Sequence, residues 1–312
     1  MEPERVAVVD LGTNSTRLLV ADVADGAVTD LEHRSEVRRL GEGVDESGRL
    51  SDEAIARVHE TLGEYREVID SLGATTVIGV ATSAVRDAEN GEEFREEVRE
   101  RFGIDARIIS GAEEARLTFL GATPARGRRD VEAMVLDIGG GSTEFVVGRA
   151  GSEPRFHVSA TLGSVRHSER HLASDPPSQG EVQALREDVR RTIEAEVPAD
   201  VRESASAGIA VAGTATSLAA IDLQLDPYDR SRVHGHELSL ASSETILAEL
   251  AAKSLEERRL VTGLDPARAP TIVAGAVILV EAMKAFHLDA IEVSEADLLH
   301  GAALTAAGWT DG

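Results

Sequence analysis

The sequence predicts an α/β protein made of two similar halves, each built on a β-sheet flanked by helices. Three observations support this prediction. First, one stretch occurs twice: residues 6–21 read VAVVDLGTNSTRLLVA, and residues 133–148 read AMVLDIGGGSTEFVVG. Second, short β-branched runs alternate with longer amphipathic segments after each copy, as expected for alternating strands and helices. Third, 312 residues are enough for two domains of ordinary size.

Each copy of the repeat predicts a β-hairpin with a glycine-rich turn. Both copies have the same order: an apolar run, Asp, an apolar residue, Gly, two small or polar residues, Ser-Thr, one charged residue and a second apolar run. Glycines in such turns let backbone N–H groups approach an anion, and the hydroxyls add donors. Two ordinary tight hairpins are the alternative. The shared order favours two phosphate-binding turns that would hold a phosphate chain from both sides.

Charged residues accompany both turns. Asp10 and Asp137 end the first strand of each hairpin, where a carboxylate can hold a hydrated Mg²⁺ beside a bound phosphate. The charged position after Ser-Thr differs between the copies, because it is Arg17 in the first and Glu144 in the second. The repeat therefore predicts a charge clamp in one copy and a catalytic carboxylate in the other.

The composition restricts the location and the partners of the chain. It has no cysteine, so disulfides and thiolate metal sites are excluded. No apolar run reaches the roughly 18 residues of a membrane-spanning helix, and the N-terminus lacks the pattern of a signal peptide. We expect a soluble cytoplasmic protein. The net charge of -24 and an aromatic content of 3% argue against binding to nucleic acid or to anionic membranes.

The first half continues in order from its hairpin. Residues 27–40 extend the hairpin to a three-stranded meander. Residues 51–72 have a helical period of apolar residues, with Ser51 as the cap. Further predicted strands are 76–81 and 106–109, and further helices are 92–102, a short one after Thr82-Ser83 and one that begins at Ser110 or Gly111. Residues 121–130 are rich in Gly, Pro and Arg and mark a boundary between domain I (1–122) and domain II (123–297).

The second half repeats this plan. After its hairpin we predict strands at 155–159, 208–212 and 290–293, and helices at 163–172, 180–196, 242–264, 272–286 and 297–307. Ser294-Glu295 is the predicted cap of the last helix. The C-terminal segment, about residues 298–312, is a candidate to return to domain I.

Two histidine pairs have spacings found in metal sites. His167 and His171 are four residues apart, which can bind a metal on one helix face, but no third ligand is evident near them in the sequence. A solvated helix face is therefore the favoured interpretation. His234 and His236 would lie on one face of a strand. Metal binding there is the less favoured interpretation, and the sequence does not indicate another role for them.

The sequence also excludes several mechanisms. It contains neither G-x-x-x-x-G-K-[ST] nor G-x-G-x-x-G, the patterns of P-loop and Rossmann nucleotide sites, and it has no thiol nucleophile. What remains is a cleft between two similar halves, with anion-binding turns and carboxylates. This inventory fits metal-assisted attack of water on a phosphoanhydride, in which donors hold the phosphates and a glutamate orients or deprotonates the water.

Five motifs together closely resemble the exopolyphosphatase/guanosine pentaphosphate phosphohydrolase family, over nearly the whole chain. They are Asp10-Leu-Gly-Thr-Asn-Ser-Thr-Arg17, Ala81-Thr-Ser-Ala-Val-Arg86 with Asn90, Ile109-Ser-Gly-Ala-Glu-Glu-Ala-Arg116, Asp137-Ile-Gly-Gly-Gly-Ser-Thr-Glu144 and Ala212-Gly-Thr-Ala-Thr-Ser217. The family lies within the actin and sugar-kinase superfamily. The resemblance therefore implies two duplicated ribonuclease-H-like domains with an interdomain cleft.

The resemblance also implies roles for individual residues. Glu114 would be the general base, assisted by Glu144, and Asp10, Asp137 and Glu144 would hold Mg²⁺ (or Mn²⁺). The implied phosphate-binding residues are Gly12, Asn14, Ser15, Arg17, Arg86, Gly139, Gly141, Ser142, Gly213 and Thr214.

At two of these positions the residue types also suit a purely structural role. Glu113 and Glu114 in the first turn of a helix would complement the helix dipole. Arg86 would form a surface salt bridge to Asp87 or Glu89. Only the resemblance favours catalysis at Glu114.

Two departures from the family pattern concern the C-terminal part. Many longer relatives carry further helical domains, whereas this chain stops at Gly312, which leaves its hold on long polymers open. Where many relatives read Ser-x-x-Gly-Leu-Arg-Glu-Gly, this chain has Leu299 in place of the Arg. This variant is similar to that of short two-domain members.

The resemblance implies an exopolyphosphatase that releases terminal orthophosphate from inorganic polyphosphate. Hydrolysis of the 5′-terminal phosphate of guanosine pentaphosphate is the first alternative, and the sequence does not separate the two. A polyphosphate or nucleotide sensor without turnover and a sugar-kinase-like ATPase are further alternatives. The family also implies a homodimer.

Overall fold

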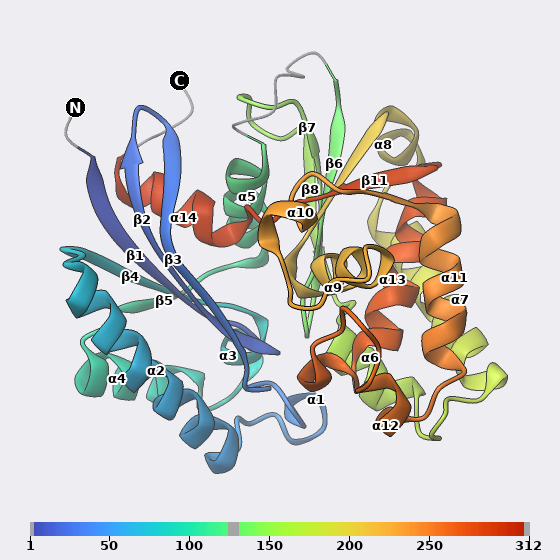
Figure 1. Cartoon of the computed structure of the whole chain (residues 1–312), viewed down its shortest axis with the longest axis horizontal. Helices are drawn as coiled ribbons and strands as arrows, with labels where there is room; N and C mark the ends of the chain where they lie inside the picture. Colours follow the sequence, from blue (N-terminus) through green and yellow to red (C-terminus); the bar gives the residue numbers. More distant parts are fainter. Residues whose placement is uncertain (1–2, 124–130, 309–312) are drawn as a thin grey trace. The chain divides into compact units, whose positions relative to one another are not determined.

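The computed structural model describes residues 3–123 and 131–308, which form two compact units (Figure 1). The first unit contains the described residues up to Thr123 together with those from Asp297 onward. The second unit contains residues 131–296. The chain thus leaves the first unit once and comes back to it for its last helix.

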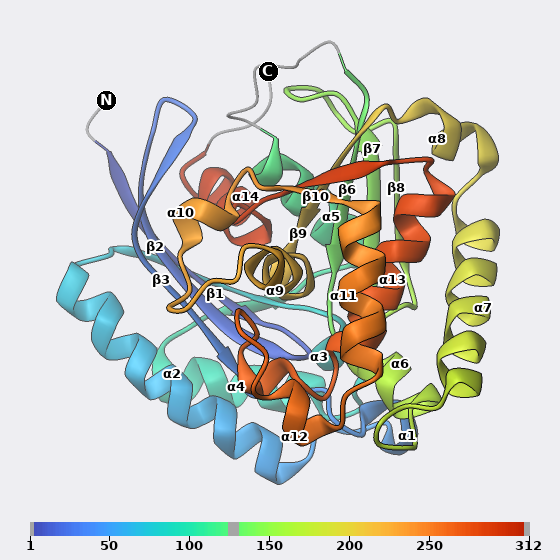
Figure 2. The ribbon, with the colours of Figure 1, turned by 45° about the vertical axis from the view of Figure 1, so that its right-hand side comes forward.

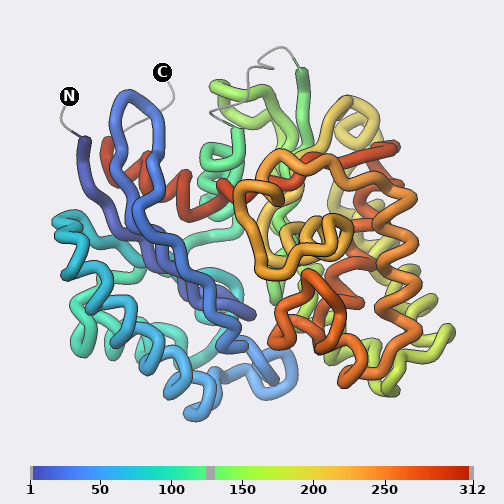
Figure 3. The backbone as a smooth tube through the Cα atoms, in the orientation of Figure 1, coloured from blue at the N-terminus to red at the C-terminus, as the bar shows by residue number. Residues whose placement is uncertain are grey.

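The sheet of the first unit has the strand order β3-β2-β1-β4-β5. Strands β1 (Glu4–Leu11), β2 (Ser15–Ala24) and β3 (Ala27–Val37) form the predicted antiparallel meander, whose backbone is the tube at the blue end of the chain in Figure 3. Strands β4 (Thr76–Ala81) and β5 (Ala106–Ile108) continue the sheet in parallel beyond β1. The sheet is therefore mixed, and its first connection is a tight turn.

Alternate residues of β1 face opposite sides of this sheet, as strand geometry requires. Ala7, Val9 and Leu11 pack in one core cluster, on the side covered by α2 (Asp52–Leu72) and α4 (Gly91–Phe102). Val6 and Val8 pack in another cluster, on the side covered by α5 (Gly111–Ala122) and α14 (Leu298–Ala306). Two short helices complete the unit, α1 (Val44–Ser47) and α3 (Ser83–Asp87).

The sheet of the second unit has the order β10-β11-β9-β6-β7-β8. Its antiparallel meander consists of β6 (Ala133–Ile138), β7 (Thr143–Gly148) and β8 (Phe156–Ala160). Strands β9 (Ala207–Val211) and β11 (Ala290–Val293) continue it in parallel, and β10 (Glu237–Ser239) is added antiparallel at the edge. Apart from β10, the order repeats that of the first unit, which confirms the predicted duplicated ribonuclease-H-like fold.

Helix α13 (Ile272–Ala285) is the centre of the second unit's core. It packs against α6 (Ser164–His171), α7 (Gln179–Glu196), α9 (Ala212–Asp222) and α11 (Leu240–Ala251), as Figure 2 shows for α7 and α11 on its two sides. Nearly all of its residues are buried, because neighbours cover it all round. The short elements are α8 (Ala199–Ser204), α10 (Arg230–Val233), α12 (Leu255–Arg258) and a 3-10 helix (Pro266–Arg268).

Three details differ from the sequence predictions. The helices predicted to fill residues 242–264 are α11 and α12, and residues 259–264 are not helical. Helix α5 continues to Ala122, so the predicted connector begins later than residue 121, and its residues 124–130 lie outside the described part of the chain. The cap of the last helix is not Ser294-Glu295 but Asp297, whose side chain accepts a hydrogen bond from the Leu299 amide.

Leu299, the residue at which the sequence was expected to depart from the family pattern, is a core residue. It is fully buried in the cluster that joins α14 to the β1 face of the first sheet. A guanidinium could not be buried there without a partner, so the departure from the family pattern is compatible with the packing of this unit.

Candidate active site

The first hairpin places Asp10 directly opposite Arg17 across β1 and β2. Arg17 Nε donates to Asp10 Oδ2 at 2.8 Å, and its Nη1 donates to Asp297, the cap of α14. Both carboxylates are 3% exposed. The predicted phosphate-binding arginine is therefore held between two buried acids, and the second of them, Asp297, was not expected from the sequence.

The pKa values of the two acids are shifted in opposite directions. Burial raises the pKa of Asp10 above its ordinary value, and the charge and hydrogen bond of Arg17 reduce this shift without cancelling it. Burial would also raise the pKa of Asp297, but the charges of Arg17 and His300 and the hydrogen bond from the Leu299 amide hold it below its ordinary value. Asp297 is thus the fixed partner of Arg17, and Asp10 is the acid that a cation would stabilise.

Three side-chain oxygens of this hairpin have no hydrogen-bond partner among the described residues. They are Asp10 Oδ1, Asn14 Oδ1 and Thr16 Oγ1, and all three atoms are buried. Buried polar atoms are almost always paired, and leaving one unpaired costs about 1–3 kcal/mol. Carboxylate and amide oxygens are ligands that Mg²⁺ prefers. The residues present therefore fit the predicted cation at Asp10.

The turn of the first hairpin is fixed to the start of α3. Thr13 Oγ1 lies 2.8 Å from Ser83 Oγ and accepts a hydrogen bond from the Ala84 amide at 3.1 Å. At Gly12 an added Cβ would lie 2.8 Å from the Ser15 carbonyl oxygen, so the turn closes too tightly for a side chain there. The predicted turn and the predicted Thr-Ser element are thus brought together in one unit.

Glu114, the predicted base, lies on α5 and pairs with Arg86 of α3. Arg86 Nη1 donates to Glu114 Oε2 at 3.2 Å and to the Ile109 carbonyl oxygen at 2.9 Å. The Glu114 side chain is buried, whereas the nearest approach of Arg86 to Asp87 is 3.9 Å. The ion pair with Asp87 considered for Arg86 is thus present, but the contact of Arg86 with the candidate base is shorter.

The second hairpin places Asp137 directly opposite Glu144 across β6 and β7. Asp137 is 6% exposed and Glu144 is 1% exposed, and Ser159 Oγ donates to Glu144 Oε1 at 2.6 Å. Directly opposed residues project on the same face of a sheet, where like charges are destabilising. Two buried carboxylates on one face have the chemistry of cation ligands.

The backbone carbonyl groups of the glycine-rich turn of this hairpin all accept hydrogen bonds from α6. The Gly139 carbonyl oxygen accepts from the Ser164 amide at 3.0 Å, and the Gly140 carbonyl oxygen accepts from the Val165 amide at 2.9 Å. The Gly141 carbonyl oxygen accepts from Arg166 Nε at 3.0 Å.

These three carbonyls therefore point toward the first turn of α6. In a planar trans peptide the N–H points opposite to the C=O. The amides of residues 140–142 consequently point away from α6.

A third turn joins β9 to α9 at Gly213 and Thr214. Ala212 has a positive φ of 63°, a strained conformation for a residue with a side chain. An added Cβ at Gly213 would lie 1.8 Å from Arg268 Nη1, so this guanidinium lies against the turn. Arg268, in the 3-10 helix Pro266–Arg268, was missed from the sequence because nothing in its own segment indicates an anion site.

The predictions for both histidine pairs need correction, since His234 and His236 do not lie on a strand and the first pair is not on a solvated helix face. His167 is buried rather than solvated, and burial lowers its pKa to about 4. A third group is present as well, since Asp188 of α7 meets both His167 and His171. His234 and His236 precede β10 and have separate partners: His234 Nδ1 accepts from the Glu295 amide, and His236 Nε2 lies 2.8 Å from Asp222 Oδ2.

Comparison with known proteins agrees with this architecture. The chain matches the Ppx/GppA phosphatase family over residues 19–307. Exopolyphosphatase 2 of Mycobacterium tuberculosis is 37% identical over 317 residues, which cover 97% of this chain and 99% of that protein. Exopolyphosphatase 1 of Mycobacterium bovis is 32% identical and covers 93% of this chain and 84% of that protein.

Solved structures show the same likeness. An exopolyphosphatase-like protein has a TM-score of 0.90 at 35% identity, with 98% of both chains covered. The Aquifex aeolicus member of the Ppx/GppA family has a TM-score of 0.80 at 30% identity, again with 98% of both chains covered. Among the described residues, no helix has the length and apolar character needed to span a membrane. By the family match over nearly all of its length, the chain belongs to the Ppx/GppA phosphatase family, a family of hydrolases.

Proposed function

We propose that this protein is a Mg²⁺-dependent exopolyphosphatase, which hydrolyses the terminal phosphoanhydride bond of inorganic polyphosphate. One observation carries the proposal. In the second unit, two buried carboxylates, Asp137 and Glu144, flank a turn whose successive amides point the same way. A polyphosphate with its counter-cation needs both features, acidic ligands for the cation and N–H donors for the phosphate oxygens. The relatives named exopolyphosphatase, at 37% and 32% identity, support the choice of substrate.

The phosphate groups would be held by three turns and their arginines. We assign to this role the turn at Gly12, Asn14 and Ser15, the turn at Gly139, Gly141 and Ser142, and the turn at Gly213 and Thr214. Arg17, Arg86 and Arg268 add positive charge, which matters because the chain as a whole carries a net charge of -24. A polyanion approaching such an acidic protein needs a local concentration of donors.

Three carboxylates are assigned to the cation, Asp137 and Glu144 in the second unit and Asp10 in the first. When bound, Mg²⁺ (or Mn²⁺) offsets the negative charge of the phosphate oxygens and of the buried carboxylates. The unpaired Asp10 Oδ1 and the opposed Asp137 and Glu144 are the observations that support these three ligands.

Glu114 would act as the general base. Its carboxylate takes a proton from a water molecule whose oxygen attacks the terminal phosphorus. A new P–O bond forms, the bridging P–O bond breaks, and orthophosphate leaves a polyphosphate one unit shorter. Arg86, bonded to Glu114 at 3.2 Å, would keep the base beside the phosphate that it serves, and Glu144 would assist.

A comparison of substrates tests the proposal. The purified protein is incubated with inorganic polyphosphate, guanosine pentaphosphate or ATP in the presence of Mg²⁺, and released orthophosphate is measured. We expect release from polyphosphate at a kcat/KM well above that for either nucleotide. Release from guanosine pentaphosphate alone would assign the chain to the other activity of the family. Binding of polyphosphate without release would make it a sensor, and phosphate transfer from ATP to a sugar would make it a kinase.

Two expectations from the sequence stay predictions. A homodimer, implied by the family resemblance, is tested by light scattering of the purified chain. A cytoplasmic location is tested by fractionation of cells that express it.

A further inference from the structure

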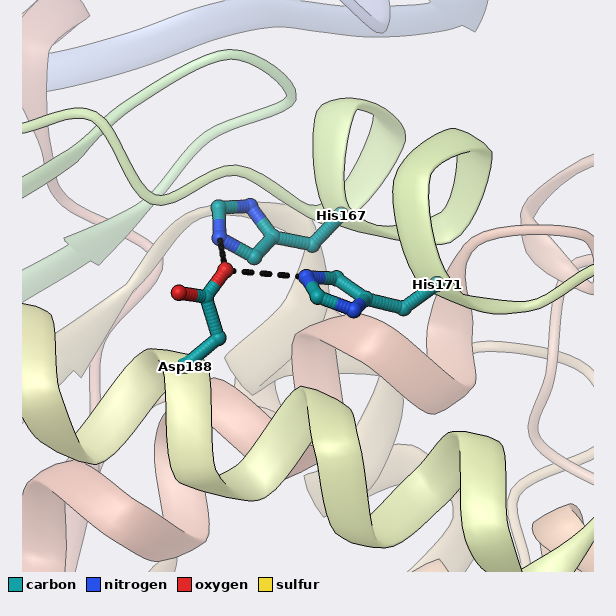
Figure 4. A group of neighbouring side chains, drawn as sticks. All are labelled: His167, His171 and Asp188. Carbon is teal, nitrogen blue, oxygen red and sulfur yellow. Dashed lines mark hydrogen bonds and ion pairs between the residues drawn. The ribbon is translucent and has the colours of Figure 1, made fainter.

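His167, His171 and Asp188 form a cluster apart from the residues assigned to catalysis, within the second unit (Figure 4). The two histidines lie one turn apart on α6, and Asp188 projects from α7 toward both of them. Asp188 Oδ2 is 2.9 Å from His171 Nε2 and 3.7 Å from His167 Nε2. One ligand atom from each residue can be chosen so that all three lie within 4.8 Å of one another.

These separations match those around a tetrahedral metal ion. Zinc lies about 2.0–2.2 Å from imidazole nitrogen and carboxylate oxygen, which puts neighbouring ligand atoms about 3.3–3.6 Å apart. The observed 2.9 and 3.7 Å fall on either side of this range. These two separations differ from the tetrahedral ones by a few tenths of an ångström, and the third pair, between the two imidazole nitrogens, lies within 4.8 Å.

Two of the three side chains also have hydrogen-bond partners on the atoms that would not bind the metal. The Gly163 carbonyl oxygen and the Gly163 amide nitrogen both lie 3.2 Å from His167 Nδ1. A metal at Nε2 requires the tautomer with its proton on Nδ1, and the Gly163 carbonyl oxygen lies where it can accept that proton's hydrogen bond. Arg191 donates to Asp188 Oδ1 at 3.0 Å, which leaves Oδ2 facing the histidines. Hydrogen bonds of this kind, which set the tautomer and the orientation of a metal ligand, are typical of metal centres.

A simple ion pair does not account for the whole cluster. The contact between His171 and Asp188 has the length of an ordinary charged hydrogen bond. It does not explain why a second imidazole, His167, is 1% exposed and directs its Nε2 at the same carboxylate oxygen. A shared metal ion uses all three groups at once.

We propose that His167, His171 and Asp188 bind one divalent transition-metal ion of the zinc type, with water as its fourth ligand. Imidazole nitrogen selects Zn²⁺, Co²⁺ or Ni²⁺ over Mg²⁺, which prefers oxygen ligands. The site is therefore chemically distinct from the carboxylate site assigned to Mg²⁺. Two side chains of the cluster, those of His171 and Asp188, are 20% and 27% exposed, so the ion can enter from solvent.

The ion would have a mechanical consequence for the second hairpin. The first turn of α6 holds the carbonyls of residues 139–141, and an added Cβ at Gly163 would lie only 2.2 Å from the Gly140 carbonyl oxygen. A metal bound by residues of both α6 and α7 would hold α6 in place and so stabilise the position of this glycine-rich turn.

Zinc titration of the untagged, full-length protein tests the site. Excess Mg²⁺ is kept in the buffer to occupy the oxygen-only sites, and binding is followed by calorimetry. A parallel titration with Co²⁺ follows the intense visible absorption of a tetrahedral site. His171→Ala and Asp188→Asn are the test variants, because these side chains are partly exposed and their loss is compatible with folding. His157→Ala is the matched control, since it removes an exposed imidazole from the same unit.

We expect the protein and the His157→Ala control to bind one more zinc ion per chain than either test variant. Loss of one ligand should weaken binding at this site at least about tenfold. Zinc should also raise the Tm of the protein and of the control, and leave the Tm of both test variants unchanged. Zinc stoichiometry and affinity that are the same in all four proteins would overturn the proposal, as would an absence of tetrahedral Co²⁺ absorption in the unsubstituted protein.

Discussion

Asp137 and Glu144 lie directly opposite each other on β6 and β7, and both carboxylates are buried. At the same position of the first hairpin, Asp10 lies opposite Arg17. Asp10 and Arg17 form an ion pair of 2.8 Å, whereas Asp137 and Glu144 are two acids on one face of their sheet. The duplicated fold thus carries opposite charge patterns at equivalent places, which is why we assign the cation mainly to the second unit.

Replacement of one acid of this pair should stabilise the protein when no cation is present. Glu144→Gln keeps an oxygen that can accept from Ser159 but removes the repulsion, so we expect the unfolding free energy without Mg²⁺ to rise by up to about 1 kcal/mol. The increase in Tm that Mg²⁺ causes in the unsubstituted protein should become smaller. Thermal unfolding in EDTA and in Mg²⁺ measures both effects. Glu237→Gln, at an exposed strand position, is the control. A lower Tm in EDTA together with an unchanged response to Mg²⁺ would rule out a cation at Glu144.

The bridge between Arg17 and Asp297 should limit phosphate binding. Asp297→Asn removes one negative partner of Arg17, while Asn remains a good N-cap for α14. We expect the KM for polyphosphate to fall about fivefold, equivalent to about 1 kcal/mol of binding energy, and the unfolding free energy to fall as well. Steady-state kinetics and urea unfolding measure the two effects.

Asp30→Asn is the matched control for this variant. It removes an equal charge from a contact of the same helix, because Asp30 Oδ1 lies 3.1 Å from His300 Nε2. An equal fall in KM in both variants would mean that the change of net charge, and not the release of Arg17, is responsible.

Gly213→Ala should weaken substrate binding through Arg268. The new methyl group would lie 1.8 Å from Arg268 Nη1, so the guanidinium must move away from the turn. We expect the KM for polyphosphate to rise about tenfold, because an arginine–phosphate contact is worth roughly 1.5–3 kcal/mol, with little change in Tm. Gly63→Ala, which meets no atom within 4 Å, is the control for adding a methyl group. A normal KM in Gly213→Ala would remove Arg268 from the set of phosphate ligands.

Stability should depend on pH through Glu181, in the capping box of α7. Hydrogen bonds from the Ser174 side chain and from the amide and hydroxyl of Ser178 lower the pKa of Glu181 to about 2. Because the folded-state pKa lies below the ordinary value, this carboxylate stabilises the fold above about pH 4.5, and the effect is lost as the pH falls toward 2.

The variant Glu181→Ala isolates this contribution. Its Tm should be lower than that of the unsubstituted protein at pH 7, and the difference should shrink steadily between about pH 4.5 and the acid limit of folding. A difference in Tm that is constant over this range would show that the ionised form of Glu181 makes no contribution.

Local patterns were sufficient to predict most of the fold. The two hairpins, the helix capped by Ser51 and the buried strand β4 depend on residues that are neighbours in sequence, and the structure has each of them where it was predicted. The wrong prediction for the cap of the last helix concerns residues that are close together in the sequence. Ser294, Glu295 and Asp297 could each cap a helix, and the contact of Asp297 with Arg17, from the other end of the chain, distinguishes it.

The candidate site was predicted less completely, because several of its residues meet only in three dimensions. Arg268 reaches Gly213 from a segment with no motif of its own, and Asp188 reaches His167 from a different helix. The pairing of Glu114 with Arg86 likewise joins two helices. Such contacts leave no trace in residue spacing, whereas the register of Asp137 with Glu144 follows directly from the hairpin that the repeat predicts.

The most direct test of the central claim is the rate of orthophosphate release from polyphosphate by Glu114→Gln, measured at saturating substrate and Mg²⁺. Glu113→Gln is the matched control, since it changes the neighbouring glutamate, which pairs with Arg107 instead. We predict that Glu114→Gln lowers kcat by a factor of about 10² or more, that its affinity for polyphosphate stays near normal, and that Glu113→Gln keeps its activity. A Glu114→Gln protein with the kcat of the unsubstituted enzyme would contradict the account.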